Sequence, residues 1–285
     1  MSDPAYLLSS PLGEPGSGRV RYGAAMALYQ AGRICAAALE VYRIAAAHDG
    51  RDPRPMLAER GLAAPVPAEP EGGACLAALL AEADRYLARL PGDGPVEVRQ
   101  GIARWTGPIG PQPGPSNPVV DAHMGVALAS LAATHPTLAG CIGDAVRHLT
   151  WVTYDLYPRA EIGEDFANGH AFASIIGGTA PIVATDFDLG LFLIAPNVLY
   201  RDHCHRAPEL YAPLTGPHGW RFGPDLPLTI KPAHQPVWNP PDQPHLTKVG
   251  RVPFLCLFGW TRDVNEPARV IQANDWPALE ALRLG

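Results

Sequence analysis

Short runs of apolar and β-branched residues fill the chain from Trp151 onward, and their spacing constrains the fold more than any other feature. The clearest runs cover residues 151–157, 171–176, 189–195 and 252–260. Between the runs stand GGTAP, TDFDLG, APN, TGPHG, GPDLP and NPPDQP, whose Gly, Pro, Asn and Asp residues favour turns. Strands that follow one another at this short spacing predict an antiparallel sandwich or barrel.

The first half of the chain has the sequence texture of helices instead. Residues 21–48 are rich in alanine, with apolar positions near helical spacing, and residues 76–90, 118–133 and 137–149 are three further helix candidates. Asn117 stands where it can cap the helix that begins at the following proline. The first half therefore predicts a set of helices, each able to bury one face.

Two stretches rich in Pro and Gly, residues 52–73 and 107–118, interrupt the helical half and predict loops. We therefore predict an α+β chain. Its N-terminal helical region, residues 1–149, is expected to pack on an antiparallel β-barrel domain, residues 150–285.

Composition narrows the class of protein. The chain is 47% hydrophobic and 18% charged, a balance typical of a globular protein. A net charge of −6 and a pI of about 5.9 provide no field that would attract nucleic acid or anionic lipid. Five scattered cysteines fit neither a disulfide framework nor a thiolate zinc site. With no apolar stretch long enough to span a bilayer, we expect a soluble cytoplasmic protein.

One segment, YRDHCHRAPELY at 200–211, concentrates residues that carry chemistry. His203, His205, Glu209 and Tyr211 all occupy odd positions, which the alternation of a strand would aim at one face. Two imidazoles and a carboxylate suit a transition metal such as Zn, Fe, Mn, Co or Ni, whereas Ca or Mg prefers oxygen ligands. The segment predicts a metal site of open metal identity.

A fourth ligand is available downstream. His245 ends the turn-rich segment WNPPDQPH, and its participation would leave coordination positions open for substrate. Two histidines in a strand are as often buried core residues as ligands. The addition of Glu209, Tyr211 and His245 favours the metal site.

The pattern HxHxxxExY, followed by a Pro-rich turn and His, resembles the two motifs of the cupin superfamily. More narrowly, it resembles the cupin-type dimethylsulfoniopropionate (DMSP) lyases. The narrower resemblance depends on APN at 195–197 leading to Tyr200, on Trp238 ahead of PxxxPH, and on FLCLFGW ending at Trp260. It covers roughly residues 150–272, and the helical half carries no motif that matches.

The resemblance implies a double-stranded β-helix, the cupin barrel, and one divalent transition metal. It implies that Tyr211 is a general base and that Tyr200 assists in the substrate pocket. The implied metal ligands are His203, His205, Glu209 and His245. The implied reaction is a β-elimination that cleaves DMSP to dimethyl sulfide and acrylate.

The chemistry of that reaction needs few residues. A metal that binds the substrate carboxylate stabilises the charge that develops as the neighbouring proton leaves. The sulfonium cation calls for aromatic faces rather than a carboxylate, at roughly 0.5 to 2 kcal/mol for each cation–π contact. Trp260, Trp238 and Tyr154 are the candidates for this substrate-binding role.

Two alternatives stay open. One is a cupin metalloenzyme of another reaction, such as a dioxygenase or an isomerase of a small carboxylate, because cupin ligands alone do not fix the chemistry. The other is a non-catalytic cupin that binds a ligand. In each case the expected partner is a small molecule and not nucleic acid or a membrane, and assembly into a homodimer is left open.

Overall fold

A computed structural model describes residues 4–65, 72–224 and 226–284. The chain divides into two compact units, Met1–Pro70 and Glu71–Gly285. The boundary that the sequence suggested, between residues 149 and 150, is therefore not where the contacts divide the chain. The reason is that the helices of residues 72–145 share a hydrophobic core with the strands that follow them.

The first unit is helical. Its elements are η1 (Pro4–Ser9), α1 (Ser17–Gln30), α2 (Ala36–Ala45) and α3 (Pro53–Glu59). The single helix expected over 21–48 is wrong: Gly32, at a φ of 70°, ends α1, and Arg33 N donates to Leu28 O. The stretch 52–73, expected to be a loop, contains α3, which Asp52 caps through the Arg54 amide.

The second unit begins with helices and continues with strands. The helical elements are α4 (Gly72–Leu87), α5 (Asp93–Arg104), α6 (Pro118–Ala132), α7 (Pro136–Ala145), η2 (Val146–His148), α8 (Arg159–Ile162), α9 (Glu164–Asn168) and α10 (Trp276–Ala281). The strands are β1 (His170–Gly177), β2 (Ile182–Val183), β3 (Asp188–Ile194), β4 (Leu199–Cys204), β5 (Glu209–Pro213), β6 (His218–Arg221), β7 (Thr229–Lys231), β8 (Val237–Asn239), β9 (His245–Lys248), β10 (Phe254–Trp260) and β11 (Arg269–Val270). None of the helices within the described ranges has the length and apolarity needed to cross a bilayer.

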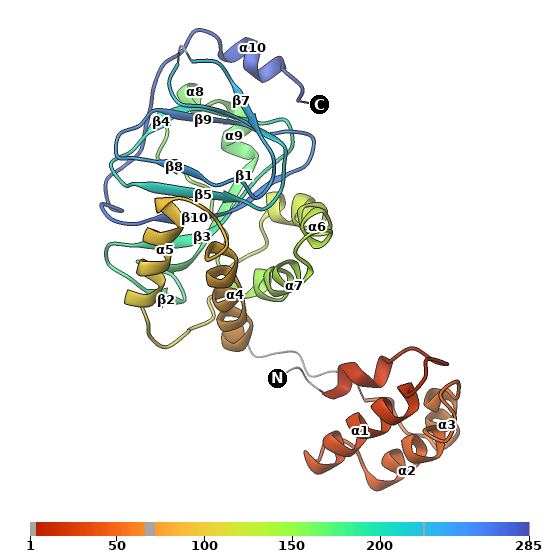
Figure 1. Ribbon diagram of the computed structural model, residues 1–285. Coiled ribbons are helices and arrows are strands. Elements are labelled where there is room, and N and C mark those ends of the chain that lie inside the picture. Colours follow the sequence, from red (N-terminus) through yellow and green to blue (C-terminus); the bar gives the residue numbers. More distant parts are fainter. Residues whose placement is uncertain (1–3, 66–71, 225, 285) are drawn as a thin grey trace. The chain divides into compact units, whose positions relative to one another are not determined.

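The strands form two sheets, which lie as separate layers in Figure 1. One sheet has the order β2-β1-β3-β10-β5-β8, and the other has the order β11-β4-β9-β6-β7. Neighbouring strands are antiparallel, apart from the parallel pair β1 and β2. The expected α+β class is confirmed. The expected single closed barrel is not what the hydrogen bonding shows, because the described strands pair within two sheets.

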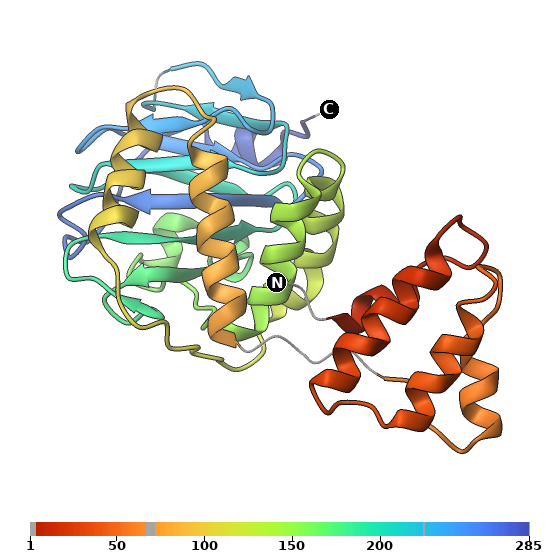
Figure 2. The ribbon, with the colours of Figure 1, turned by 60° about the horizontal axis from the view of Figure 1, so that its bottom comes forward.

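Helices α4 to α7 cover the outer face of the six-stranded sheet, which Figure 2 shows from the helical side. Leu189, Leu191 and Leu193 of β3 belong to the core shared with these helices, whereas Phe192 and Ile194 belong to a second core. Because successive side chains of a strand point to opposite faces, the even positions of β3 face the five-stranded sheet. The space between the sheets is where the candidate site lies.

In the second unit, three predicted helices are confirmed, one predicted strand is wrong and one helix was missed. The helices expected over 76–90 and 118–133 correspond to α4 and α6, and the one expected over 137–149 corresponds to α7 and η2. The strand expected over 151–157 is wrong, since this segment forms only an isolated bridge between Val152 and Phe172. Helix α5 was missed, because its Gly and Pro residues weaken the helical signal.

The cap of α6 gives a prediction about stability. Asn117 Oδ1 accepts hydrogen bonds from the amides of Val119 and Val120, at 3.0 and 3.3 Å. Substitution Asn117→Ala leaves these amides without the side-chain acceptor and should lower the free energy of unfolding by about 1 kcal/mol. Urea denaturation measures this, and Asn117→Asp, which keeps an acceptor at the helix N-terminus, serves as the control. An unchanged unfolding midpoint in the alanine variant would contradict the prediction.

Candidate metal centre

The HxHxxxExY segment does not lie on one strand. His203 belongs to β4 in the five-stranded sheet, whereas Glu209 and Tyr211 belong to β5 in the six-stranded sheet. His205 lies in the connection between the two strands. The expectation of a single strand face is therefore wrong in its geometry. The side chains still converge, because the inner faces of the two sheets oppose each other.

His245 joins this group from the neighbouring strand β9. It is the register partner of His203 in the antiparallel pair of β4 and β9, so both side chains emerge on the same face. The ring centroids of His203 and His245 are 4.0 Å apart, and those of His205 and His245 are 5.1 Å apart. The structure thus brings the distant histidine to the other two.

All three imidazoles are oriented by the backbone. The Nδ1 atoms of His203, His205 and His245 donate to the carbonyl oxygens of Arg201, Ala207 and Gln243, at 2.8, 2.7 and 2.8 Å. A carbonyl only accepts, so the proton of a neutral ring is on Nδ1 and the lone pair is on Nε2. This is the usual orientation of metal-binding histidines, whose second nitrogen is held by a hydrogen bond.

The Nε2 atoms of these histidines meet the requirements of a metal site. One ligand atom from each of His203, His205 and His245 lies within 4.8 Å of the others, and all three residues are buried. The Nε2 atoms of His203 and His245 are buried and have no hydrogen-bond partner among the described residues. Buried polar atoms are rarely left unpaired. The donor set therefore fits a divalent transition metal.

Glu209 adds a carboxylate to the cluster. Its Oε2 lies 3.1 Å from His205 Nε2 and 3.3 Å from His245 Nε2. Burial raises the pKa of Glu209, but the close approach of His205 and His245 outweighs burial and holds that pKa well below its usual range. Burial lowers the pKa of His203, and the neighbouring His245 and His205 lower it further. The cluster thus combines an ionised carboxylate with a neutral imidazole, both in the form that binds a cation.

Two tyrosines lie beside this cluster. The Tyr200 ring stacks on His203, with centroids 3.8 Å apart, and its hydroxyl is 2.9 Å from that of Tyr157. Tyr211 lies two positions after Glu209 on β5 and lines the same cavity. Burial, and next the charge of Glu209, raise the pKa of Tyr211 well above its ordinary value. Tyr211 is therefore a neutral phenol as long as the Glu209 charge is uncompensated.

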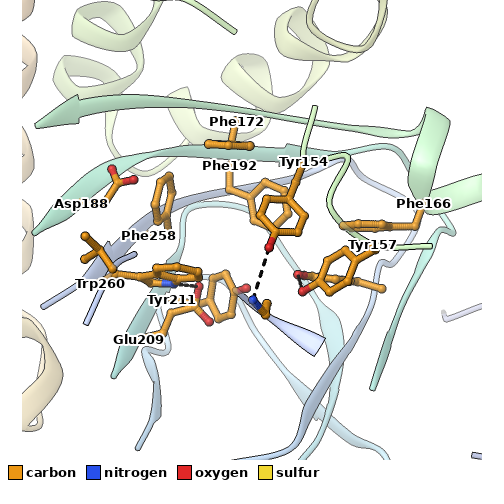
Figure 3. A pocket seen from close by; sticks show the side chains of 13 residues that line it. Tyr154, Tyr157, Phe166, Phe172, Asp188, Phe192, Glu209, Tyr211, Phe258 and Trp260 are labelled. Atoms are coloured by element: carbon orange, nitrogen blue, oxygen red, sulfur yellow. Dashed lines mark hydrogen bonds between the residues drawn. The ribbon is translucent and has the colours of Figure 1, made fainter. Parts of the chain in front are cut away.

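A cavity of about 200 Å³ opens beside Glu209 between the sheets. Figure 3 shows its wall, most of which is aromatic. The residues that line it are Tyr154, Tyr157, Phe166, Phe172, Asp188, Phe192, Tyr200, Glu209, Tyr211, Phe258, Trp260, Val264 and Ala268. An apolar pocket with a few convergent polar groups is the usual form of a small-molecule site.

A profile of the dimethylsulfoniopropionate lyase family matches residues 108–256, more than half of the chain. The chain belongs to the DMSP lyase family. The matched segment begins well before residue 150 and therefore includes α6 and α7. No motif of the family was recognised in the sequence of these two helices.

Solved structures give relatives of the same kind. The chain is similar to one from the crystal structures of the DMSP lyases RdDddP and RnDddQII, at 22% identity and a TM-score of 0.56, over 71% of this chain and 100% of that one. It is also similar to the DMSP lyase DddQ of Ruegeria pomeroyi DSS-3, at 22% identity and a TM-score of 0.48, over 68% and 95%. No curated protein matches the chain. The first of these two similarities shows that most of this chain has the fold of a solved DMSP lyase.

Three of the predicted pocket aromatics line the cavity of this DMSP lyase family member, and one does not. Tyr154, Tyr200 and Trp260 are part of the wall. Trp238 is instead the register partner of Leu210 on the outer face of the sheet, where a Cβ added to Gly94 of α5 would lie 2.6 Å from its ring. The expectation that Trp238 binds substrate is therefore corrected: strand alternation places it on the face opposite to Glu209 and Tyr211.

Sequence reasoning missed several wall residues of this family member. Phe258 of β10 lies two positions before the predicted Trp260 and shares its face, and Asp188 and Phe192 share one face of β3. Once it is known which positions of each strand face the inside, the alternation of side chains identifies these wall residues. Tyr157 and Phe166 lie outside the strands and carry no such signal.

Trp260 and Tyr154 are held in place by hydrogen bonds. Trp260 Nε1 donates to Glu209 Oε1 at 2.8 Å, and the Tyr154 hydroxyl accepts from the Ala268 amide at 3.3 Å. His170 Nε2 accepts from the Tyr154 amide at 3.0 Å, while its Nδ1 donates to Phe166 O. His170 therefore orders two parts of the pocket wall.

Proposed function

We propose that this protein is a metal-dependent carbon–sulfur lyase that cleaves DMSP to dimethyl sulfide and acrylate by β-elimination. The proposed metal ligands are His203, His205, Glu209 and His245. The observation that carries the proposal is the pair of buried, unpartnered Nε2 atoms that point to the same place beside an aromatic cavity. Membership of the DMSP lyase family supports the choice of substrate.

The ligand set suits Zn, Fe, Mn, Co or Ni. A divalent ion held there supplies positive charge that stabilises the negative charge developing on the substrate carboxylate as the neighbouring proton leaves. The protein's own contribution is orientation. Backbone carbonyls fix the three imidazoles, and Trp260 fixes the second oxygen of Glu209.

Tyr211 is the proposed general base. Its side chain lines the cavity together with that of Glu209. The charge of Glu209 is one of the two main causes of its raised pKa, so neutralising that charge favours the phenolate. The phenolate takes the proton from the carbon beside the substrate carboxylate. The carbon–sulfur bond breaks, its electron pair leaves with sulfur, and dimethyl sulfide departs as a neutral molecule that needs no acid.

Tyr200 is proposed to assist at the same site. Its ring is sandwiched between His203 and Phe166, and its hydroxyl is hydrogen-bonded to that of Tyr157. The pair of hydroxyls lies on the cavity wall and offers a polar contact for substrate. Trp260 and Tyr154 supply aromatic faces for the sulfonium group, at roughly 0.5 to 2 kcal/mol each.

We further propose that the two facing sheets correspond to the double-stranded β-helix of cupins and that residues 150–285 form the metal-binding part. The inner faces of both sheets contribute ligands, which supports this assignment. Helices α4 to α7 are proposed to support the sheet from outside.

The test is the release of dimethyl sulfide from DMSP, measured by gas chromatography of the headspace over protein loaded with each candidate metal. We expect release with at least one metal and none after removal of the metal by a chelator. Equimolar acrylate, measured in the same sample, verifies the elimination. If no metal-loaded form released dimethyl sulfide, or if oxygen were consumed in step with substrate, the lyase proposal would be wrong.

A further inference from the structure

Asp188 lies at the end of the cavity that holds Phe258 and Trp260, as Figure 3 shows. It is the register partner of Trp260, and Trp260 is the register partner of Glu209. The three residues therefore form a row across β3, β10 and β5 with their side chains on the same face. Because neighbouring strands are about 4.8 Å apart, the backbones of Asp188 and Glu209 are roughly 10 Å apart.

The carboxylate of Asp188 lacks a cationic partner. Its Oδ1 is shielded from solvent and has no hydrogen-bond partner among the described residues, and no ion pair in the described part of the chain involves it. Burial, only partly offset by the nearby Ser174 side chain, raises the pKa of Asp188 to about 7. Asp188 as a whole is half-buried, but a carboxylate oxygen shielded from water without a partner is costly, so its position on a pocket wall points to a ligand.

The surroundings of Asp188 define the kind of ligand. Phe172 and Phe258 meet edge to face, with centroids 6.1 Å apart, and Trp260 lies next along the row. Gly190 leaves room for the Phe258 ring, because a Cβ atom added to Gly190 would lie 2.7 Å from that ring. Aromatic faces beside a carboxylate bind alkylated cations, which have apolar methyl groups and no proton to donate.

We propose that Asp188, with Phe258 and Trp260, forms the seat for the onium end of a zwitterionic substrate whose carboxylate end lies at the histidine cluster. This inference deepens the proposed function and rests on it for the identity of the substrate. It differs from the expectation that aromatic faces rather than a carboxylate would receive the sulfonium group. Asp188 then selects substrates by positive charge, and a neutral thioether acid is bound poorly.

The proposed role has a kinetic consequence. The positive charge on sulfur is present in the bound substrate and disappears as the carbon–sulfur bond breaks. Asp188 therefore stabilises the bound substrate at least as much as the transition state, and its removal acts on KM rather than kcat. We expect Asp188→Asn to raise KM for DMSP about tenfold or more and to leave kcat within about threefold of the wild-type value.

The decisive experiment compares two unreactive ligands of nearly the same shape. One is 3-(trimethylammonio)propanoate, which carries the positive charge, and the other is 4,4-dimethylpentanoate, its uncharged carbon analogue. Calorimetry on the metal-loaded protein should show that the wild type binds the charged ligand about tenfold or more tightly than the neutral one. Asp188→Asn should lose that preference, whereas a change that only loosens the fold would weaken both ligands together.

The outcomes separate this inference from the proposed function. Equal affinity of the wild type for the two ligands overturns the onium seat, whether or not the variant folds. An unchanged preference in a folded Asp188→Asn variant overturns it as well, and both results leave dimethyl sulfide release untouched. Preference for the charged ligand without cleavage of DMSP would instead overturn the lyase proposal and retain the seat.

Discussion

Substitution Tyr211→Phe is expected to lower kcat for DMSP by roughly 10² to 10⁴ while the protein keeps its metal. The phenyl ring preserves the packing of Tyr211 against Phe192 and Trp220, whose ring centroids are 6.3 and 5.5 Å away. Only the hydroxyl of Tyr211 is lost. The variant thus removes the proposed base and preserves the packing of the pocket wall.

The measurement combines headspace rates with the metal content of the same sample by elemental analysis. Tyr86→Phe is a matched control, because the Tyr86 hydroxyl is also buried and burial raises its pKa, yet Tyr86 does not line the cavity. The control should keep kcat. A Tyr211→Phe enzyme within threefold of the wild type would rule out Tyr211 as the base.

Substitution His245→Ala should have the second large effect, on the metal itself. It removes one of the three clustered Nε2 atoms and leaves Glu209 with a single imidazole within 3.3 Å. Loss of a residue that only supports a ligand lowers metal affinity by about 10 to 100 times, so loss of a direct ligand should lower it by at least the larger factor. Lyase activity should fall with the metal content.

Metal stoichiometry after dialysis measures this effect, with competition against a chelator for the affinity. His234→Ala is the control, because His234 hydrogen-bonds to Tyr86 and Thr134, away from the cluster. It should retain the metal. Full metal retention by His245→Ala, with circular dichroism unchanged, would remove His245 from the ligand set.

The candidate ligands could be read from the sequence because their residue types and order are specific. His203, His205 and Glu209 stand close together, and the turn before His245 points to a strand that begins there. The sequence did not reveal that β4 and β5 belong to different sheets. Which sheet a strand joins depends on long-range pairing, and no local pattern encodes it.

The errors at the pocket have the same physical origin. Trp238 was expected in the pocket, but its pairing with Leu210 turns it outward, and this register depends on both strands. Asp188 was overlooked because TDFDLG has the composition of a turn. In the helical half, the start of α6 was predictable because Asn117 is a recognisable helix cap. The break between α1 and α2 was not predicted, because it depends on the left-handed backbone of Gly32.

The division of the HxHxxxExY segment between two sheets would couple metal binding to folding. His203 and His245 emerge from one sheet and Glu209 from the other, so an ion bound by all of them would cross-link the two layers. Binding that occurs only in the folded chain adds to its stability, by about 1.4 kcal/mol for each tenfold rise in free ion above Kd. The cell's supply of the ion would then govern how much folded enzyme persists, in addition to how much of it is active.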